Sequence, residues 1–244
     1  MDISREHKRI YRDGDRLVKE FDDTFTKADV LNEALNNARV EETGLKIPKL
    51  LDVKKGENGW VITREYIEGT SLSQLMEENP DKEDEYLEKF VDLQLEIHSK
   101  RCPHLNKIKD KMNAKISASD YEATIRYDLH NRLEGMKKHN KVLHGDYCPS
   151  NIIVTAEGEY YIVDWAHATQ GNASADAART YLVFCLQGKE ELAEKYLNLF
   201  CKKADIAKQL VWQWMPIVAC SQSTKNVEGE RELLDRWVNV FDFQ

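Results

Sequence analysis

Short runs in which apolar and polar residues alternate occupy most of the first third of the chain. Alternation with a period of two is typical of strands that bury one face. Two pairs of these runs are separated by Asp13-Gly14 and Asn58-Gly59, dipeptides that tight hairpin turns favour. We therefore expect two antiparallel hairpins, formed by residues 7–12, 15–21, 49–54 and 60–67.

One stretch between the hairpins has helical spacing instead. Its apolar residues recur three and four positions apart: Val30, Leu31, Ala34, Leu35 and Ala38. Thr26-x-x-Asp29 resembles the capping box of a helix start, although Glu or Gln is more usual at the last position. This pattern predicts a helix of about 15 residues that ends before Gly44 and has one apolar face.

Helical spacing dominates after residue 68, apart from one compact strand-rich insert. The apolar stripes are Tyr86, Phe90, Leu93 and Ile97; Tyr121, Ile125, Leu129 and Leu133 after a Ser119-x-x-Glu122 cap; and Leu234, Trp237, Val238 and Phe241. The insert has strand-like runs at residues 142–144, 152–154 and 160–163. We expect an α+β fold with a small antiparallel-sheet lobe over residues 1–67 and a larger, mainly helical lobe over residues 68–244.

Composition narrows the class of protein further. The 244 residues carry 35 Lys and Arg against 43 Asp and Glu, a formal net charge of -8, which argues against a nucleic-acid partner. No run of about 18 apolar residues occurs and residues 1–6 show no signal-peptide pattern, so we expect a soluble, cytoplasmic protein with no membrane partner. The five cysteines are odd in number and form no Cys-x-x-Cys pair, which predicts reduced thiols.

Polar side chains that could take part in catalysis or metal binding lie where the strands of the insert end. His144-Gly145-Asp146 leaves the first strand, Asn151 follows in the same loop, and Asp164 ends the next hairpin. Magnesium takes oxygen ligands, usually one or two carboxylates together with waters and substrate phosphates, which suits Asn151 and Asp164. Asp146 suits another role, that of accepting the proton of a hydroxyl that attacks phosphorus. Each residue alone is more typical of a turn cap, so the prediction depends on the set.

A lysine interrupts the apolar face of one predicted strand. Lys19 alternates in step with Leu17 and Phe21, and a buried ammonium group needs a partner. Glu33, near the apolar stripe of the following helix, could supply the opposite charge. The alternative is a lysine whose stem is buried while its ammonium group reaches water, together with a solvated glutamate.

These residues together resemble the aminoglycoside phosphotransferase and choline kinase family, which has the bilobal protein-kinase-like fold. The resemblance spans roughly residues 7–185 and rests on His144-Gly145-Asp146-Tyr147-Cys148-Pro149-Ser150-Asn151, Ile162-Val163-Asp164-Trp165, Lys19 and Glu33. The loop in which Asn follows His-Gly-Asp by five positions, and then a hairpin and Asp-Trp, is its specific part. The resemblance implies transfer of the γ-phosphate of ATP, with Mg²⁺, to a hydroxyl of a small molecule.

The resemblance also implies roles for residues that hold the nucleotide. Lys19 would contact the α- and β-phosphates and Glu33 would hold Lys19 in place. The backbone at Glu65 and Ile67, in the segment similar to the family's hinge, would face adenine. Asp176 matches the aspartate that ties down the catalytic loop, although a charge that favours a helix N-terminus is an equally good reading.

The loop residues take the remaining implied roles. Asp146 would be the catalytic base or would orient the acceptor hydroxyl, and His144 would position the loop. Asn151 and Asp164 would bind Mg²⁺. Two protein-kinase signatures, Asp-Phe-Gly and Ala-Pro-Glu, are missing, which disfavours a protein substrate.

One departure from the kinase pattern concerns the strands that cover the phosphates. No glycine precedes Gly14, and a first strand would have to fit within residues 1–4. Either backbone amides around residues 4–6 cover the phosphates, or the phosphates are less well covered than in protein kinases.

The acceptor is expected to lie against the C-terminal part of the chain. That part offers aromatic and acidic side chains: Trp165, His167, Trp212, Trp214, Trp237, Glu228, Glu230, Glu232 and Asp235. Such groups suit an amine-bearing, aminoglycoside-like acceptor, although Trp237 is more typical of a core position. Alternatives are a choline, ethanolamine or sugar kinase, a nucleotide-binding pseudoenzyme with a regulatory role and, least favoured, a metal-dependent phosphoesterase. The oligomeric state is left open.

Overall fold

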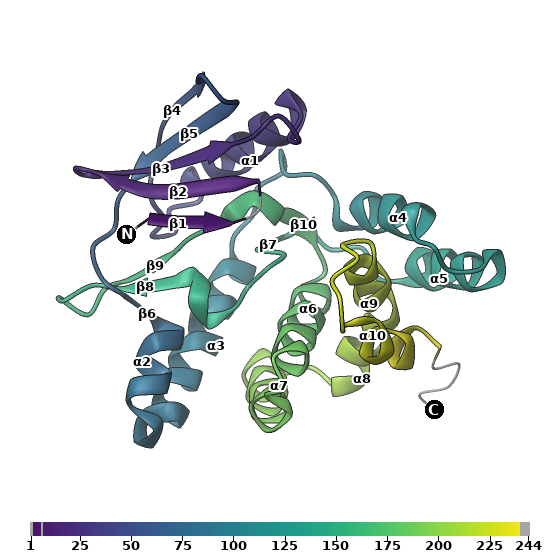
Figure 1. Cartoon of the computed structure of the whole chain (residues 1–244). Coiled ribbons are helices and arrows are strands. Elements are labelled where there is room, and N and C mark those ends of the chain that lie inside the picture. Colours follow the sequence, from purple (N-terminus) through teal and green to yellow (C-terminus); the bar gives the residue numbers. More distant parts are fainter. Residues whose placement is uncertain (1, 6, 240–244) are drawn as a thin grey trace. The chain divides into compact units, whose positions relative to one another are not determined.

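The computed structural model describes residues 2–5 and 7–239 (Figure 1). The chain divides into two compact units, one of Met1–Tyr86 with Cys148–Ala168 and one of Leu87–Tyr147 with Thr169–Gln244. The lobe boundary expected at residue 67 stays a prediction. Residues 148–168, the second part of the insert, belong to the same unit as the N-terminal strands. The first unit is therefore discontinuous in sequence.

The first unit contains a five-stranded antiparallel sheet in the order β1-β2-β3-β5-β4. Its strands are β1 (Asp2–Arg5), β2 (Lys8–Asp13), β3 (Arg16–Phe21), β4 (Leu50–Lys55) and β5 (Trp60–Glu65). Both predicted hairpins are confirmed. The tip of the second requires a glycine, because Gly59 has a φ of 154° and a Cβ there would clash with the carbonyl oxygen of Phe21.

Helix α1 (Lys27–Glu41) has the predicted length and start. Thr26 Oγ1 accepts a hydrogen bond from the Asp29 amide, and the Asp29 carboxylate accepts one from the Thr26 amide, which completes a capping box. Val30 and Ala34 pack against Phe21 of the sheet.

The predicted apolar face of α1 is wrong in part. Leu31 and Leu35 are 40% and 46% exposed, whereas Glu33, Asn36 and Asn37 are buried. The reason is that the inward face of α1 meets polar partners. Asn36 Nδ2 donates to the carbonyl oxygen of Ala166, and Asn37 Nδ2 donates to that of Pro48.

A second sheet in the first unit has the order β6-β8-β9. It consists of β6 (Thr70–Ser71), β8 (Ile152–Val154) and β9 (Tyr160–Ile162), and α2 (Leu72–Glu78) follows its first strand. Short 3₁₀ segments at Pro149–Asn151 and Trp165–His167 flank the β8-β9 hairpin. These two segments carry or border Asn151 and Asp164.

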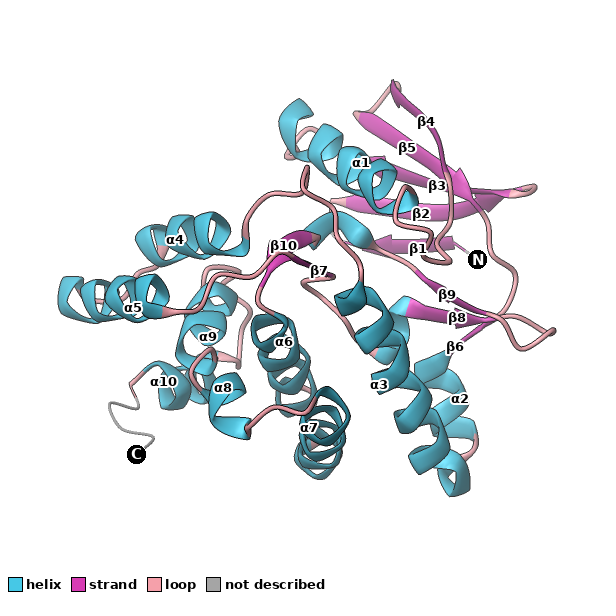
Figure 2. Cartoon of the chain, turned by 180° about the vertical axis from the view of Figure 1, so that it is seen from behind, coloured by secondary structure: helices cyan, strands magenta, loops and turns pink. Residues whose placement is uncertain are grey.

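The second unit is mainly helical and has one two-stranded sheet, formed by β7 (Lys141–Leu143) and β10 (Thr169–Gly171) (Figure 2). The expectation of one compact β insert is therefore wrong, because β7 pairs with β10 while β8 and β9 pair with β6. The helices are α3 (Glu83–Ser99), α4 (Ile108–Ala118), α5 (Ala123–Gly135), α6 (Ala173–Leu186), α7 (Glu190–Ala204), α8 (Lys208–Trp212), α9 (Met215–Ser223) and α10 (Arg231–Val238). The α+β class is confirmed.

Two details of the predicted helices change. Ser119 does not cap α5 but closes α4, because its hydroxyl donates to the carbonyl oxygen of Ile116 and α5 begins only at Ala123. Helix α4 itself was not predicted. In α10, Leu234 and Val238 are buried as expected, and Phe241 lies outside the described residues.

An aromatic cluster forms the core of the second unit beneath the loop that follows β7. Phe90 stacks on Tyr147 with ring centroids 4.4 Å apart, and the Tyr147 hydroxyl donates to the carbonyl oxygen of Phe90. The Thr180 hydroxyl donates to the carbonyl oxygen of Tyr147. These contacts fix the backbone immediately after Asp146.

The five cysteines are all buried free thiols, as predicted. Among the described residues, no helix combines the length and the apolar character that crossing a bilayer requires.

Candidate active site

A buried ion-pair cluster lies between the sheet and α1 in the first unit. The Nζ atom of Lys19, on β3, donates to Oε1 of Glu33, on α1, over 2.8 Å. The two side chains are only 9% and 7% exposed. The predicted pairing of Lys19 with Glu33 is therefore present, and the alternative of two solvated side chains does not hold.

Arg64 is a third member of this cluster, which sequence reasoning missed. Its Nη2 atom donates to the same Glu33 oxygen over 2.8 Å, and its side chain is 7% exposed. The signal was available, because Arg64 alternates in step with the buried Ile62 on β5, as Lys19 does with Phe21 on β3. One carboxylate oxygen thus holds two cations.

Asp164 approaches this cluster from the end of β9. Its Oδ1 atom lies 3.7 Å from Lys19 Nζ, and its side chain is 45% exposed. Asp164 has a φ of 62° and a ψ of 63°, a left-handed conformation that costs free energy in a non-glycine residue. The buried Trp165 holds this turn, because its indole N–H donates to the carbonyl oxygen of Ile162.

Asn151 is tied to the same strand end. The Val163 amide donates to the backbone carbonyl of Asn151 over 2.9 Å, so Asn151 and the residue before Asp164 are hydrogen-bonded neighbours. An amide and a carboxylate side chain, both oxygen donors, are thus brought to one edge of the β8-β9 hairpin. This donor set fits Mg²⁺, which combines a few protein oxygens with phosphate oxygens and water.

In the second unit, Asp176 anchors the loop after β7. Its two carboxylate oxygens accept hydrogen bonds from the His144 and Gly145 amides over 3.2 and 2.7 Å. His98 Nε2 lies 3.0 Å from Oδ2 of the same carboxylate. Burial alone would raise the pKa of Asp176, but the hydrogen bond from His98, the electrostatic effect of the two histidines and the hydrogen bond from the Gly145 amide outweigh it and lower the pKa. The carboxylate therefore stays ionised while it holds the loop.

His144 in turn positions Asp146. The imidazole is fully buried, and its Nδ1 atom accepts a hydrogen bond from the Asp146 amide over 3.3 Å. Gly145 has a φ of 81°, which lets the chain turn between the two residues. The Asp146 side chain is 30% exposed, which leaves part of its carboxylate open to solvent.

Arg179 contacts Asp146 directly, which was also missed. Its Nη2 atom lies 3.0 Å from Oδ1 of Asp146, and its Nη1 atom donates to Gln222 Oε1. Arg179 follows Asp176 by three positions on α6, so one helix face supports both the backbone and the carboxylate of the loop.

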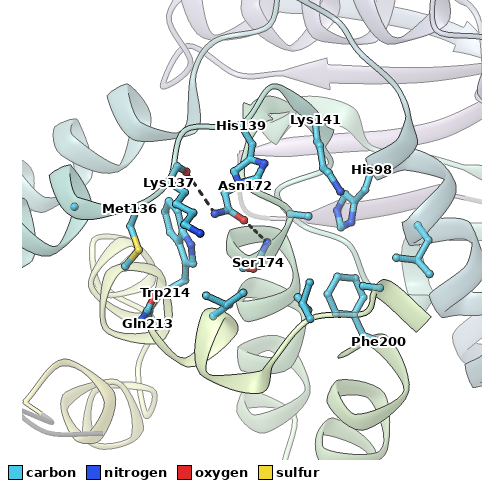
Figure 3. A pocket seen from close by; sticks show the side chains of 16 residues that line it. His98, Met136, Lys137, His139, Lys141, Asn172, Ser174, Phe200, Gln213 and Trp214 are labelled. Atoms are coloured by element: carbon cyan, nitrogen blue, oxygen red, sulfur yellow. Dashed lines mark hydrogen bonds between the residues drawn. The ribbon is translucent and has the colours of Figure 1, made fainter. Parts of the chain in front are cut away.

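A pocket of about 300 Å³ lies around the start of α6. Figure 3 shows the side chains that line it. Asn172 caps this helix by accepting from the Ser174 amide, and its Nδ2 atom donates to the carbonyl oxygen of Lys137. His98 is one wall of the pocket, whereas Asp146 is not part of its lining. The cap therefore fixes the helix turn from which Asp176 projects.

The predicted hinge includes Glu65, the last residue of β5, and Ile67 beyond it. The Glu65 amide donates to the carbonyl oxygen of Lys49, and the Tyr66 amide donates to that of Asp15. Both N–H groups therefore already donate to backbone carbonyl groups. A contact of Glu65 with adenine would use its carbonyl group, and Ile67 lies in the irregular segment after the strand.

The strands expected to cover the phosphates are short. Strand β1 ends at Arg5, one residue later than expected, and Arg5 pairs with Lys8 of β2. Just before β2, His7 has a φ of 71°, the conformation that glycine usually supplies. Glu6, one of the residues whose amide was expected to cover the phosphates, lies outside the described residues.

Most side chains expected to face an amine-bearing acceptor have other roles. Trp165 and Trp214 are buried in the core, and Trp212 stacks on Trp237 with ring centroids 5.5 Å apart. The acids are engaged as follows: Glu230 accepts from Gln222, Glu232 pairs with Arg236, and Asp235 accepts from Tyr121 and Arg231. His167 and Glu228 are exposed.

Several solved structures share this fold at low sequence identity. An aminoglycoside phosphotransferase APH(4)-Ia, solved as a ternary complex with ADP and hygromycin B, matches with a TM-score of 0.69 and 14% identity over 98% of this chain and 90% of that chain. Choline kinase LicA from Streptococcus pneumoniae matches with a TM-score of 0.65 and 16% identity over 95% and 89%. APH(3'')-Id from Streptomyces rimosus, in complex with ADP and streptomycin, matches with a TM-score of 0.64 and 16% identity over 87% and 90%.

These likenesses confirm the expected protein-kinase-like fold. No match was found among curated protein sequences. Residues 4–212 match the family described as the phosphotransferase enzyme family, and this range includes every site residue discussed above from Lys19 to Arg179. The chain belongs to the phosphotransferase enzyme family.

Proposed function

We propose that this phosphotransferase moves the γ-phosphate of ATP, bound with Mg²⁺, to a hydroxyl group of a small molecule. The observation that carries the proposal is the Lys19–Glu33 pair, 2.8 Å long and buried, with Asp164 Oδ1 3.7 Å from the same ammonium group. A lysine and a strand-end carboxylate at this distance suit the phosphates and the metal of one nucleotide. The buried free cysteines support a reducing compartment, the cytoplasm, as its location.

Lys19 would neutralise charge on the α- and β-phosphates. Glu33 would keep the ammonium group in place, because its carboxylate is itself fixed by Arg64. Asn151 and Asp164 would hold Mg²⁺, which when bound neutralises the charge on the phosphate oxygens. The carbonyl group of Glu65 and the backbone of Ile67 would face adenine.

Asp146 would accept the proton of the acceptor hydroxyl, or orient that hydroxyl, as it attacks the γ-phosphorus. Its position is set by the His144 imidazole and, through the backbone, by Asp176. Phosphoryl transfer depends chiefly on alignment and charge neutralisation, so a rigid loop is what the reaction requires.

The test combines turnover with nucleotide binding. ADP release is measured with Mg²⁺ and ATP over panels of amino-sugars, choline, ethanolamine, neutral sugars and hydroxylated anions. Asp146→Asn should lose at least 100-fold in kcat, a typical effect of removing a catalytic base, while Mg²⁺-ATP still raises its melting temperature. Asp164→Ala should lose the metal-dependent part of that rise. Equal turnover by wild type and Asp146→Asn would remove Asp146 from the mechanism.

The same experiment separates the alternatives. Nucleotide binding with no ADP release above the Asp146→Asn level in any panel would support a nucleotide-binding pseudoenzyme instead. Turnover confined to amino-sugars would support the amine-bearing acceptor expected from the sequence, and turnover confined to choline or to neutral sugars would support the other acceptor classes.

A further inference from the structure

Basic residues from three parts of the second unit, Arg179, Lys111 and Lys225, interact with the charge of Asp146, and Lys115 acts on the two lysines. Arg179 of α6 contacts the Asp146 carboxylate over 3.0 Å. Lys111 and Lys115 lie one turn apart on the same face of α4, and Lys225 follows the end of α9. Helix α9 packs against both α4 and α6 (Figure 1), which brings these segments together. The sequence assigned no role to any of these four residues.

The four positive charges are close enough to act on one another. The pKa of Lys111 is lowered to about 8 by burial of its ammonium group and by the charges of Lys115, Lys225 and Arg179, against the opposite effect of Asp146. Lys225 is exposed as a residue, yet its pKa is also lowered, by burial of the ammonium group and then by Arg179. Two acids, Asp146 and Glu230, act on the same lysines, so four basic groups face two acidic ones here.

The acids near these cations are already engaged. Asp146 is paired with Arg179, and Glu230 accepts a hydrogen bond from Gln222. A cationic acceptor beside Asp146 would add a further positive charge to this cluster. An acceptor with a phosphate or carboxylate group would instead reduce the repulsion, and phosphate and carboxylate are the groups that lysine ammonium and arginine guanidinium groups bind.

We propose that the acceptor is a small hydroxylated anion, whose phosphate or carboxylate group is bound by Lys111, Lys115 and Lys225 while its hydroxyl faces Asp146. The inference rests on the proposed function and names its substrate class. In the step itself, the acceptor oxygen forms a bond to the γ-phosphorus and its proton passes to the Asp146 carboxylate. The bond from that phosphorus to the β–γ bridging oxygen breaks, and ADP leaves with the electron pair.

Binding of an anion can be tested without any turnover. Inorganic phosphate, added to the nucleotide-free protein, should raise the melting temperature of wild type more than that of a Lys111→Gln/Lys115→Gln variant. Lys109→Gln is the matched control, because Lys109 lies on the same helix but donates to the carbonyl oxygen of Glu134. An equal response of the double variant and wild type would overturn the proposal, whatever the enzyme's activity.

Turnover then identifies the class of anion. ADP release is compared for matched pairs, a neutral polyol or sugar against its monophosphate and against the corresponding hydroxy acid, with choline and amino-sugars as the cationic arm. We expect kcat/KM at least 10-fold higher for an anionic member, and Lys115→Gln should raise KM for that acceptor several-fold with KM for ATP unchanged. A preference for neutral or cationic acceptors would refute the inference while leaving the phosphotransferase function intact. Failure of the function itself would show as no Asp146-dependent ADP release with any acceptor.

Discussion

Replacing Glu33 by Gln tests the buried cluster of the first unit directly. The change keeps the size of the side chain but removes the negative charge that faces both Lys19 Nζ and Arg64 Nη2, each 2.8 Å from the same oxygen. Lys19 keeps a second carboxylate, that of Asp164, at 3.7 Å. For Arg64, Glu33 is the carboxylate within salt-bridge distance among the described residues, so Arg64 becomes the uncompensated buried charge.

The expected loss of stability follows from this burial. Removing one partner of a buried ion pair costs about 3–5 kcal/mol, because a desolvated charge is left without compensation. For a chain of this size that corresponds to a fall in melting temperature of about 6–20 °C. An exposed pair behaves differently. Lys46 and Glu159 are 57% and 45% exposed, and Glu159→Gln should lower the unfolding free energy far less than Glu33→Gln does.

The assay is urea and thermal unfolding of Glu33→Gln, Glu159→Gln, Arg64→Met and the Glu33→Gln/Arg64→Met double variant. If the uncompensated guanidinium causes the loss, the double variant should be more stable than Glu33→Gln alone. A Glu33→Gln protein within about 1 kcal/mol of wild type, or a double variant less stable than Glu33→Gln, would refute the reasoning.

Three further changes test other parts of the structure. The pKa of Asp176 is lowered in the folded protein, so ionisation of its carboxylate stabilises the fold at pH values above the ordinary aspartate pKa of about 3.9. This stabilisation is lost as the pH falls through the lowered pKa of the folded protein. Asp176→Asn should therefore be less stable than wild type at pH 7 and lose less stability on acidification, as acid titration by circular dichroism would show. Gly59→Ala should be destabilised by several kcal/mol, whereas Gly158→Ala, where a Cβ meets no neighbouring atom, should lose only about 1–2 kcal/mol; equal losses in urea unfolding would contradict this. Thr26→Ala should lose about 1 kcal/mol by the same measurement, and no loss would mean that the cap is made by solvent instead.

Local patterns predicted the elements of the first unit well. Asp13-Gly14 and Asn58-Gly59 mark turns whose geometry depends on the residues in the turn itself, so the hairpins could be read directly. The Lys19–Glu33 pair could be inferred because a lysine on the buried face of a strand has few ways to be stabilised.

The sequence predictions that were wrong or missing concern contacts between segments far apart in the chain. The assignment of Leu31 and Leu35 to the core used helical spacing alone, which does not reveal that α1 meets the carbonyl group of Ala166 and needs an amide there. The pairing of β7 with β10 failed for the same reason, since three-residue strands carry too little pattern to name a partner. Arg179 beside Asp146 depends on how α6 lies against the loop.

The hydrogen bond from Asn36 to Ala166 has a consequence for synthesis of the chain. The two residues are 130 positions apart, yet both belong to the first unit, which also takes its β8-β9 hairpin from residues 148–168. At a translation rate of about 5–20 residues per second, the ribosome needs about 7–26 s to add these residues. During that interval the N-terminal sheet and α1 lack residues 148–168, the segment that completes their packing. A fragment that stops after the N-terminal strands would remain in this incomplete state, with the part of α1 around Asn36 open to water.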